Sequence, residues 1–169
     1  MEKKTSLENV LRLAAETDAL TDLPNRYCME QYLMQKDEKG VSIALFLFDV
    51  NFLKKTNDRE GHLAGDALLK RAARCISTCF ETFSDAKCFR YGGDEFTAIV
   101  KGCREEEIGE TIARLEEAQK NSDVSLAIGY AYTLDIGQAT IRALFSEADK
   151  KMYEQKKQIH DRISEEENK

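Results

Sequence analysis

The sequence predicts an α/β domain with a mixed central sheet flanked by helices. Segments with the apolar spacing of helices alternate with short β-rich segments along the chain. Residues 41–49 are almost continuously apolar, which is typical of a central strand covered on both faces. Two further β-rich segments, 88–91 and 96–100, flank the sequence Gly92-Gly93-Asp94-Glu95, which predicts a hairpin. Helices and strands that alternate around one hairpin favour the α/β class.

The helices are expected in the following order. Thr5 and Glu8 form a capping box, so a first helix should run to about residue 16. Pro24 suits the first turn of a second helix that reaches about Met34. Apolar stripes at helical spacing predict longer helices at about 63–83, 105–120 and 141–159, with a strand at 124–132 before the last one.

Length and composition limit the possible classes of protein. The 169 residues suffice for one compact domain and are too few for two. We expect a linker helix at 1–17, the domain at 18–163 and a polar tail at 164–169. The net charge of −6 argues against binding to nucleic acid or to membranes. The longest apolar run, 43–48, is far shorter than the roughly 20 residues of a membrane span. Because no signal segment opens the chain, we expect a cytoplasmic protein.

The five cysteines are expected to pack in the core. They include no Cys-x-x-Cys pair, so their spacing does not indicate a metal or redox site. Cys75 and Cys79 lie four residues apart, on one face of a predicted helix, where free cysteine behaves as a small apolar residue.

Three acidic residues are the strongest candidates for chemistry. Asp49 ends the expected central strand, and Asp94 and Glu95 lie in the hairpin turn. If the hairpin lies beside that strand, the carboxylates converge, and each like-charged pair costs roughly 1–4 kcal/mol unless a cation is bound. Oxygen ligands without His or Cys favour Mg²⁺ or Mn²⁺, and paired ions suit nucleotidyl transfer. An acidic surface patch is the alternative, because two glycines alone indicate only a turn.

The segment between this strand and the next helix is predicted to be a loop that binds a nucleotide. Lys54 and Lys55 supply the cations that a triphosphate requires, and the backbone amides of Phe52 and Leu53 are placed to cradle phosphates. The alternative for the polar residues of this loop is turn formation and helix capping.

Two side chains of this region are suited to guanine. Asp66 can accept from the N1–H and N2–H₂ of the base, and the Asn57 amide can match O6 or N3. Adenine lacks that pair of donors, so such a site should reject it. Gly65 lies inside the helical pattern at a cost of roughly 1 kcal/mol, which suggests a close approach there.

The last predicted helix adds two basic positions. Lys156 and, four residues later, His160 share one face of that helix. They are suited to hold the β and γ phosphates, or else they are solvated side chains.

Together these segments resemble the GGDEF family of diguanylate cyclases from about residue 18 to 160. The resemblance rests on Asp18–Arg26 (DALTDLPNR), on the segment Asp49–Asp66, and on Arg90–Phe96 (RYGGDEF), supported by 125–129 and 148–156. It implies a fold akin to nucleotide cyclase and polymerase palm domains. It also implies that two GTP molecules become cyclic di-GMP in a homodimer of half-sites, with an upstream sensory domain.

The resemblance also assigns roles. It implies catalytic roles for Asp49, Asp94 and Glu95, with one of the hairpin acids often proposed as the base. It implies Mg²⁺ or Mn²⁺, two ions per site, on these side chains and the Val50 carbonyl. Substrate contacts are implied for Asn57 and Asp66 (guanine), for Phe52, Leu53, Lys54 and Lys156 (phosphates), and for His62, Gly92 and Gly93 near the nucleotide.

Four positions depart from the family pattern. Asn51 replaces a common aspartate, and Asp22 replaces a glycine, which should change local geometry more than chemistry. His160 replaces an arginine, which should weaken triphosphate binding. The product-inhibition motif Arg-x-x-Asp would fall on residues 83–86 and is not matched. Two alternatives remain open: a module that binds GTP without turnover, and an enzyme that makes a mixed guanine–adenine dinucleotide, against which Asp66 argues.

Overall fold

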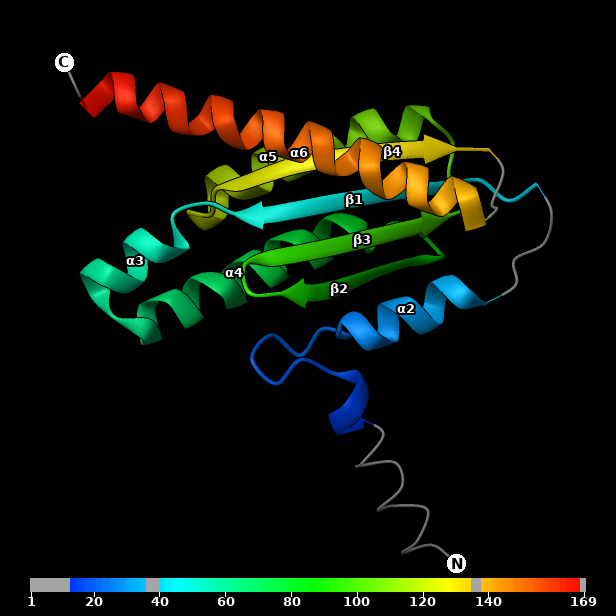
Figure 1. Cartoon of the computed structure of the whole chain (residues 1–169), viewed down its shortest axis with the longest axis horizontal. Helices are drawn as coiled ribbons and strands as arrows, with labels where there is room; N and C mark the ends of the chain where they lie inside the picture. The colour runs from blue at the N-terminus through cyan, green and yellow to red at the C-terminus, as the bar shows by residue number, and fades with distance from the viewer. Residues whose placement is uncertain (1–12, 36–39, 135–137, 168–169) are drawn as a thin grey trace, which may run out of the picture.

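The computed structural model describes residues 13–35, 40–134 and 138–167. A four-stranded sheet in the order β2-β3-β1-β4 forms the centre of the chain, and helices lie on both of its faces (Figure 1). The strands are β1 (Ile43–Val50), β2 (Ala86–Gly92), β3 (Glu95–Lys101) and β4 (Leu126–Thr133). The helices are α2 (Arg26–Met34), α3 (Leu53–Glu60), α4 (His62–Phe80), α5 (Glu106–Ser122) and α6 (Gln138–Glu167).

The predicted α/β class and the hairpin are confirmed. The strand directions differ from the expectation, because a mixed sheet was predicted and the sheet is antiparallel. All three pairings of these strands are antiparallel. β1 and β2 run in the same direction, but β3 lies between them, so no two neighbouring strands are parallel. Among the described residues, the one parallel pairing is the isolated bridge between Asn25 and Arg90.

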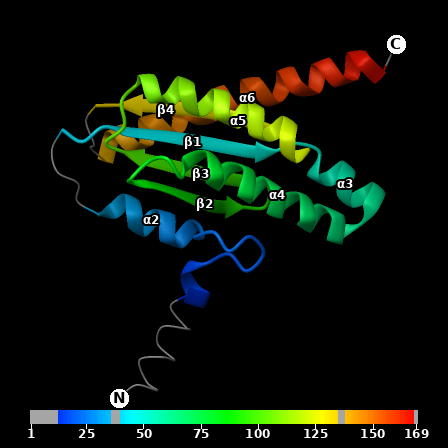
Figure 2. The same cartoon turned by 180° about the vertical axis from the view of Figure 1, so that it is seen from behind.

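The alternation of side chains along β1 creates two apolar cores. Helices α4 and α5 cover one face of the sheet (Figure 2). Phe46 and Phe48 point to this face, where the ring of Phe80 meets that of Phe46 edge-on at 5.0 Å. Ile43 and Leu45 point to the opposite face, toward α2 and α6. β1 is therefore buried on both faces, as its continuous apolar sequence predicts.

Three predicted boundaries are wrong. The segment 51–58 was expected to be a loop, but 53–60 form α3. The last helix runs from Gln138 to Glu167, not from 141 to 159, so the expected polar tail is helical as far as 167. These two additions are mostly polar, so they lack the apolar spacing that reveals a helix. The predicted helix 63–83 is α4, which ends at Phe80; Phe83 packs against the core from beyond the helix, so the apolar pattern continues past its end. Of the predicted first helix, residues 13–16 are helical, and the rest lies outside the described residues.

Helix α6 is held closely against β4. A side chain at Gly129 would overlap the backbone of α6 at Ala148 and Met152, so glycine permits this approach. The Ile128 amide donates to Gln155 Oε1, and Lys151 Nζ donates to the Tyr130 carbonyl at 3.0 Å. These contacts fix the rotation of α6 over the sheet.

Of the five cysteines expected in the core, Cys75, Cys79 and Cys103 are buried, whereas Cys28 and Cys88 are half-buried. Among the helices that the structure describes, none combines the length and the apolar character needed to cross a bilayer.

Candidate functional site

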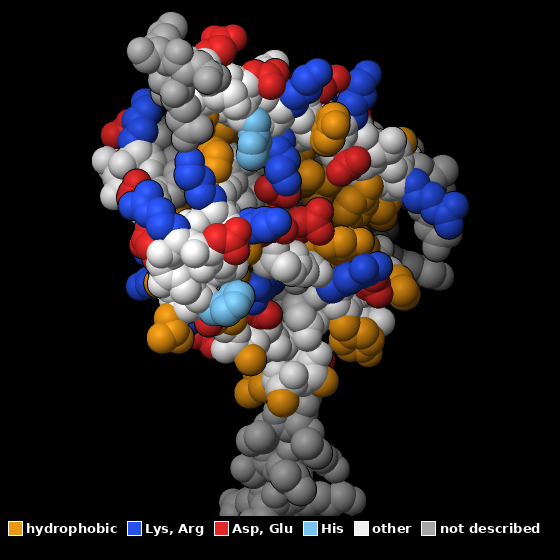
Figure 3. Space-filling model, turned by 60° about the vertical axis from the view of Figure 1, so that its left-hand side comes forward, with side chains coloured by type: hydrophobic (Ala, Val, Ile, Leu, Met, Phe, Trp, Pro, Cys, Tyr) orange, Lys and Arg blue, Asp and Glu red, His pale blue; other side chains and the backbone are white. Residues whose placement is uncertain are grey.

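The candidate site is a cleft at the carboxyl end of β1, between α3 and the last turns of α6. Its volume is about 680 Å³. Acidic, basic and histidine side chains gather on this face of the molecule (Figure 3). The lining comes from the end of β1, from α3, from the hairpin and from α6: Asp49, Val50, Asn51, Phe52, Leu53, Lys54, Lys55, Asp58, Arg59, Asp94, Lys156, His160, Ile163 and Ser164.

The strand register places the three candidate acids next to one another. Asp49 on β1 is the cross-strand partner of Glu95 on β3. The Val50 amide donates to the Asp94 carbonyl at 2.9 Å, so the hairpin turn is fixed to the end of β1. Cross-strand partners lie side by side on one face of a sheet, so Asp49 and Glu95 share the face that α6 covers.

Asp49 is the most buried member of this cluster. It is 6% exposed, and its Oδ2 accepts from Lys156 Nζ at 2.7 Å. Its Oδ1 is buried and has no hydrogen-bond partner among the described residues. Burial raises the pKa of Asp49, repulsion from Asp94 adds to the rise, and the bond to Lys156 opposes it. Burial would lower the pKa of Lys156, but the bond to Asp49 outweighs it and leaves that pKa raised. The length of the contact supports a charged pair.

The pKa of Glu95 is also raised in this acidic cluster. Burial raises its pKa first, and the charges of Asp94 and Asp49 raise it further. A bound cation would oppose this repulsion, and carboxylate oxygens are suitable ligands for a hard cation such as Mg²⁺.

The cluster fits a divalent ion without being a preassembled metal site. The unpartnered Oδ1 of Asp49 is a free carboxylate ligand beside the acids of the hairpin. Within the described ranges, no three His, Cys, Asp or Glu side chains already stand in a metal-binding arrangement. Lys156 holds one oxygen of Asp49, and Glu95 lines a different cavity, so these side chains would have to move.

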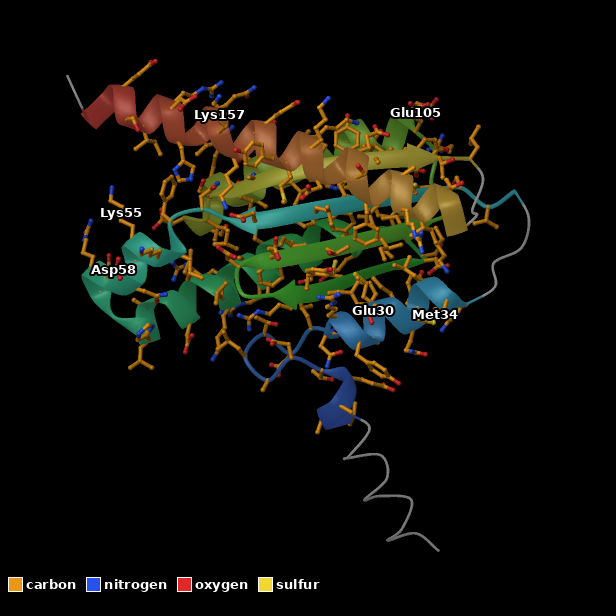
Figure 4. The ribbon with its side chains drawn as sticks, viewed as in Figure 1. Glu30, Met34, Lys55, Asp58, Glu105 and Lys157 are labelled. Carbon is orange, nitrogen blue, oxygen red and sulfur yellow. The ribbon has the colours of Figure 1, made fainter. Side chains whose placement is uncertain are left out.

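The phosphate side of the cleft is the beginning of α3. Phe52 precedes this helix with a φ of 64°, a left-handed conformation that is costly for a bulky residue. Among the described residues, no side chain caps the helix, and a helix N-terminus of this kind suits an anion. The His160 ring lies 5.3 Å from the Phe52 ring. Lys55 and Asp58 project from α3, while Lys157, next to Lys156, points away from the sheet (Figure 4).

The residues expected to bind guanine lie outside the described lining of this cleft. The Asn57 side chain packs against Gly65, where a Cβ would overlap its amide. The sequence predicted that some group lies close to the helix at Gly65, and that group is the Asn57 side chain. Asp66 is half-buried on α4, and His62 is exposed at the start of that helix.

The glycines of the hairpin turn are both exposed. Gly93 has a φ of 55°, which suits glycine. Its carbonyl accepts from the Arg90 guanidinium.

Sequence reasoning missed a link from the N-terminal turn to the hairpin. Arg90 donates to both oxygens of Asp18, at 2.9 and 3.1 Å, and to the Gly93 carbonyl at 2.8 Å. Asp18 also accepts from the amides of Leu20 and Thr21. A lone Arg and a lone Asp separated by 72 positions carry no local signal that they pair.

The departure at Asn51 has a structural explanation. Asn51 is buried, its amide nitrogen donates to Ser125 Oγ at 3.0 Å, and its backbone amide donates to the Ser125 carbonyl at 2.9 Å. It therefore joins the end of β1 to the start of β4. The cleft residues Arg59, Ile163 and Ser164 were also missed, the last two because α6 was predicted to end before them.

The chain is similar to known proteins of one family. The family described as "Diguanylate cyclase, GGDEF domain" matches residues 15–162. Diguanylate cyclase A of Treponema denticola is 27% identical over an alignment of 191 residues that includes gaps, and the alignment covers 96% of this chain and 50% of the relative. The probable diguanylate cyclase DgcI of Escherichia coli is 32% identical over 152 residues, which cover 89% of this chain and 33% of the relative. The chain thus spans about half the length, or less, of these curated relatives.

The fold resembles solved structures of the same family. The coiled coil and GGDEF domain of DgcB from Caulobacter crescentus, solved with cyclic di-GMP, has a TM-score of 0.79 at 23% identity, covering 92% of this chain and 88% of that one. A microbial GGDEF domain described in its interaction with cyclic di-GMP has a TM-score of 0.66 at 31% identity, covering 84% and 93%. Because the family match extends over nearly all the described residues, the chain belongs to the GGDEF domain family.

Proposed function

We propose that the chain is a diguanylate cyclase domain, which joins two GTP molecules into cyclic di-GMP and releases pyrophosphate. The observation that carries this proposal is the register of Asp49 against Glu95, beside Asp94, at the edge of a cleft that also holds Lys54 and Lys156. Carboxylates next to cations are the pattern that a metal-bound triphosphate needs. The names of the relatives support the same activity.

Asp49, Asp94 and Glu95 and the Val50 carbonyl would hold Mg²⁺ or Mn²⁺, two ions per site. When bound, the ions supply activation of the attacking 3′-oxygen and stabilisation of the leaving pyrophosphate. The unpartnered Oδ1 of Asp49 supports this assignment, because a buried carboxylate oxygen without a partner is costly.

The triphosphate would lie against the start of α3. The free amides at Phe52 and Leu53 would bind the phosphates, and Lys54 and Lys156 would neutralise them. Lys156 would exchange its bond to Asp49 for the phosphates when the nucleotide enters.

Guanine would lie between α3 and α4 and be recognised by Asn57 and Asp66. For this, the Asn57 amide would turn from Gly65 toward the base. His62 lies at the start of α4, near this position.

One domain would hold one GTP, so turnover needs a homodimer with a two-fold axis. Each 3′-oxygen would then attack the α-phosphate held by the partner, in line with the leaving pyrophosphate. The arrangement of the two half-sites supplies much of the rate. We also propose an upstream sensory domain, since the curated relatives extend well beyond the matching region.

A second candidate function is a module that binds GTP without turnover. It is favoured by His160 in place of arginine and by the bond that holds Lys156 on Asp49. Both features weaken the hold on the triphosphate.

Incubation with GTP and ATP in the presence of Mg²⁺ or Mn²⁺, followed by mass analysis of the products, separates the candidates. Cyclic di-GMP supports the cyclase, and GTP binding without product supports the module. A mixed dinucleotide would contradict the assignment of Asp66. Glu95→Gln should fold and lose turnover, whereas Glu154→Gln, which removes an exposed acid of α6, should keep it. A fully active Glu95→Gln enzyme would exclude a chemical role for that carboxylate.

A further inference from the structure

A second cavity lies between the sheet and α6. It is on the face of the sheet that carries both α6 and α2 (Figure 1). Its volume is about 290 Å³. Tyr91, Phe145 and Met152 contribute apolar walls, and Glu95 and Asp149 contribute carboxylates. No Lys, Arg or His belongs to the lining that the described residues provide. The cavity is therefore acidic and apolar at once, unlike the basic nucleotide cleft.

A buried polar atom in this cavity has no protein partner. Thr97 lines the cavity and is 0% exposed, and its Oγ1 has no hydrogen-bond partner among the described residues. Its cross-strand partner is Leu47, on the face of the sheet that α6 covers. A buried hydroxyl without a partner is unfavourable unless a ligand or an ordered water meets it.

The two carboxylates of the cavity come from different elements. Glu95 begins β3, and Asp149 lies on α6. Both side chains line the cavity and are exposed, so a ligand that enters it can reach them. A positive charge bound between them would be attracted by an acidic group on each side.

We propose that this cavity binds a small organic monocation with an apolar body, of the aryl-alkyl ammonium class. The ammonium group would donate to Glu95, Asp149 and the Thr97 hydroxyl, which together offer three acceptors. The apolar body would pack against Tyr91, Phe145 and Met152, and a ring with a short chain suits a cavity of this size. A nucleotide would be repelled by the two carboxylates, and a hydrated divalent ion gains nothing from the apolar walls.

Phenethylamine is the probe, and titration of the ¹⁵N-labelled chain without nucleotide or metal is the measurement. We expect saturable binding at roughly millimolar concentrations or below, with amide shifts confined to the cavity residues. 2-Phenylethanol, which has the same ring and no charge, should not saturate the site.

Two variants test the contacts. Asp149→Asn should weaken phenethylamine binding by roughly tenfold, because it removes a charged acceptor. Thr97→Val should weaken it by roughly fivefold while leaving the fold as stable or more stable, since valine has the same shape without the unpartnered hydroxyl. Asp161→Asn is the matched control, an exposed acid of the same helix away from the cavity, and should bind as the unsubstituted chain does.

Several results would overturn the proposal. They are equal binding of the neutral alcohol, unchanged binding by Asp149→Asn or Thr97→Val, and shifts located in the nucleotide cleft. Absence of saturation by the folded chain would also overturn it.

The cavity shares Glu95 with the proposed metal site. One consequence of this sharing, which rests on the proposed function, is competition between the amine and the metal. Phenethylamine and Mg²⁺ should each lower the affinity of the other by the same factor. Amine binding that is insensitive to Mg²⁺ would contradict the coupling and the metal role of Glu95. The binding without metal would still stand, so the two failures are distinguishable.

Discussion

Lys156 Nζ lies 2.7 Å from Asp49 Oδ2, and this bond connects the C-terminal helix to the end of the central strand. The two residues are 107 positions apart, and both belong to the proposed nucleotide site. The lysine is partly exposed, whereas the carboxylate is buried, so the bond chiefly offsets the burial of Asp49. In the chain by itself, the lysine serves as the cation that contacts the acidic cluster.

Replacing Lys156 should therefore destabilise the metal-free chain and strengthen its response to Mg²⁺. We expect Lys156→Met to lower the free energy of unfolding by about 1–3 kcal/mol, because a buried carboxylate loses its partner and the exposed part of the lysine reduces the effect. Thermal unfolding with and without Mg²⁺ is the measurement, and Mg²⁺ should raise the Tm of this variant more than that of the unsubstituted chain. Lys157→Met, on the outward side of α6, should leave both values unchanged. An equal response to Mg²⁺ would argue against a shared position for the lysine and the ion.

The raised pKa of Glu95 predicts a pH-dependent effect of Glu95→Gln. The folded state holds the Glu95 proton more tightly than the unfolded state, whose value is near 4.5. The charge of Glu95 therefore disfavours folding above the raised pKa, and this penalty disappears as the pH falls below 4.5. Without metal, Glu95→Gln should be more stable than the unsubstituted chain at neutral pH and equally stable in acid. Urea unfolding across this range tests it, with Glu154→Gln as the control; a constant difference at every pH would contradict the assignment.

The sequence predicts the parts of this molecule whose cause is local. The continuous apolar segment predicts the buried central strand, and two glycines between β-rich segments predict the hairpin, because each pattern acts within a few residues. The register that places Asp49 opposite Glu95 required the assumption that the hairpin lies beside the strand. The bonds from Arg90 to Asp18 and from Asn51 to Ser125 join distant segments, and no spacing in the sequence indicates them. Helix α3 was missed because it has no apolar face of sufficient length.

Asp22 occupies a position that favours glycine. Its φ is 62°, in the left-handed region that an aspartate adopts only at a cost. Asp22→Gly should raise the free energy of unfolding by about 0.5–1 kcal/mol, because glycine adopts this conformation without steric cost. Asp22→Ala should lower it, since alanine has neither that freedom nor the short polar side chain that makes the left-handed conformation more tolerable for aspartate. Chemical denaturation compares the three proteins, and an order other than Gly, Asp, Ala would contradict this explanation.

Gly129 determines how closely α6 approaches the sheet and therefore where Lys156 lies. Gly129→Ala should destabilise the chain by about 1–3 kcal/mol, because the added carbon would overlap the backbone of α6 at Ala148 and Met152 and separate the helix from β4. The shift should also move Lys156 away from the proposed phosphate site, so GTP binding and the Tm should fall together. Gly109→Ala is the matched control: nothing lies within 4 Å of its added carbon, and helix propensity should stabilise that variant by about 0.5–1 kcal/mol. If both alanine variants have the same stability, the close approach of α6 does not depend on glycine.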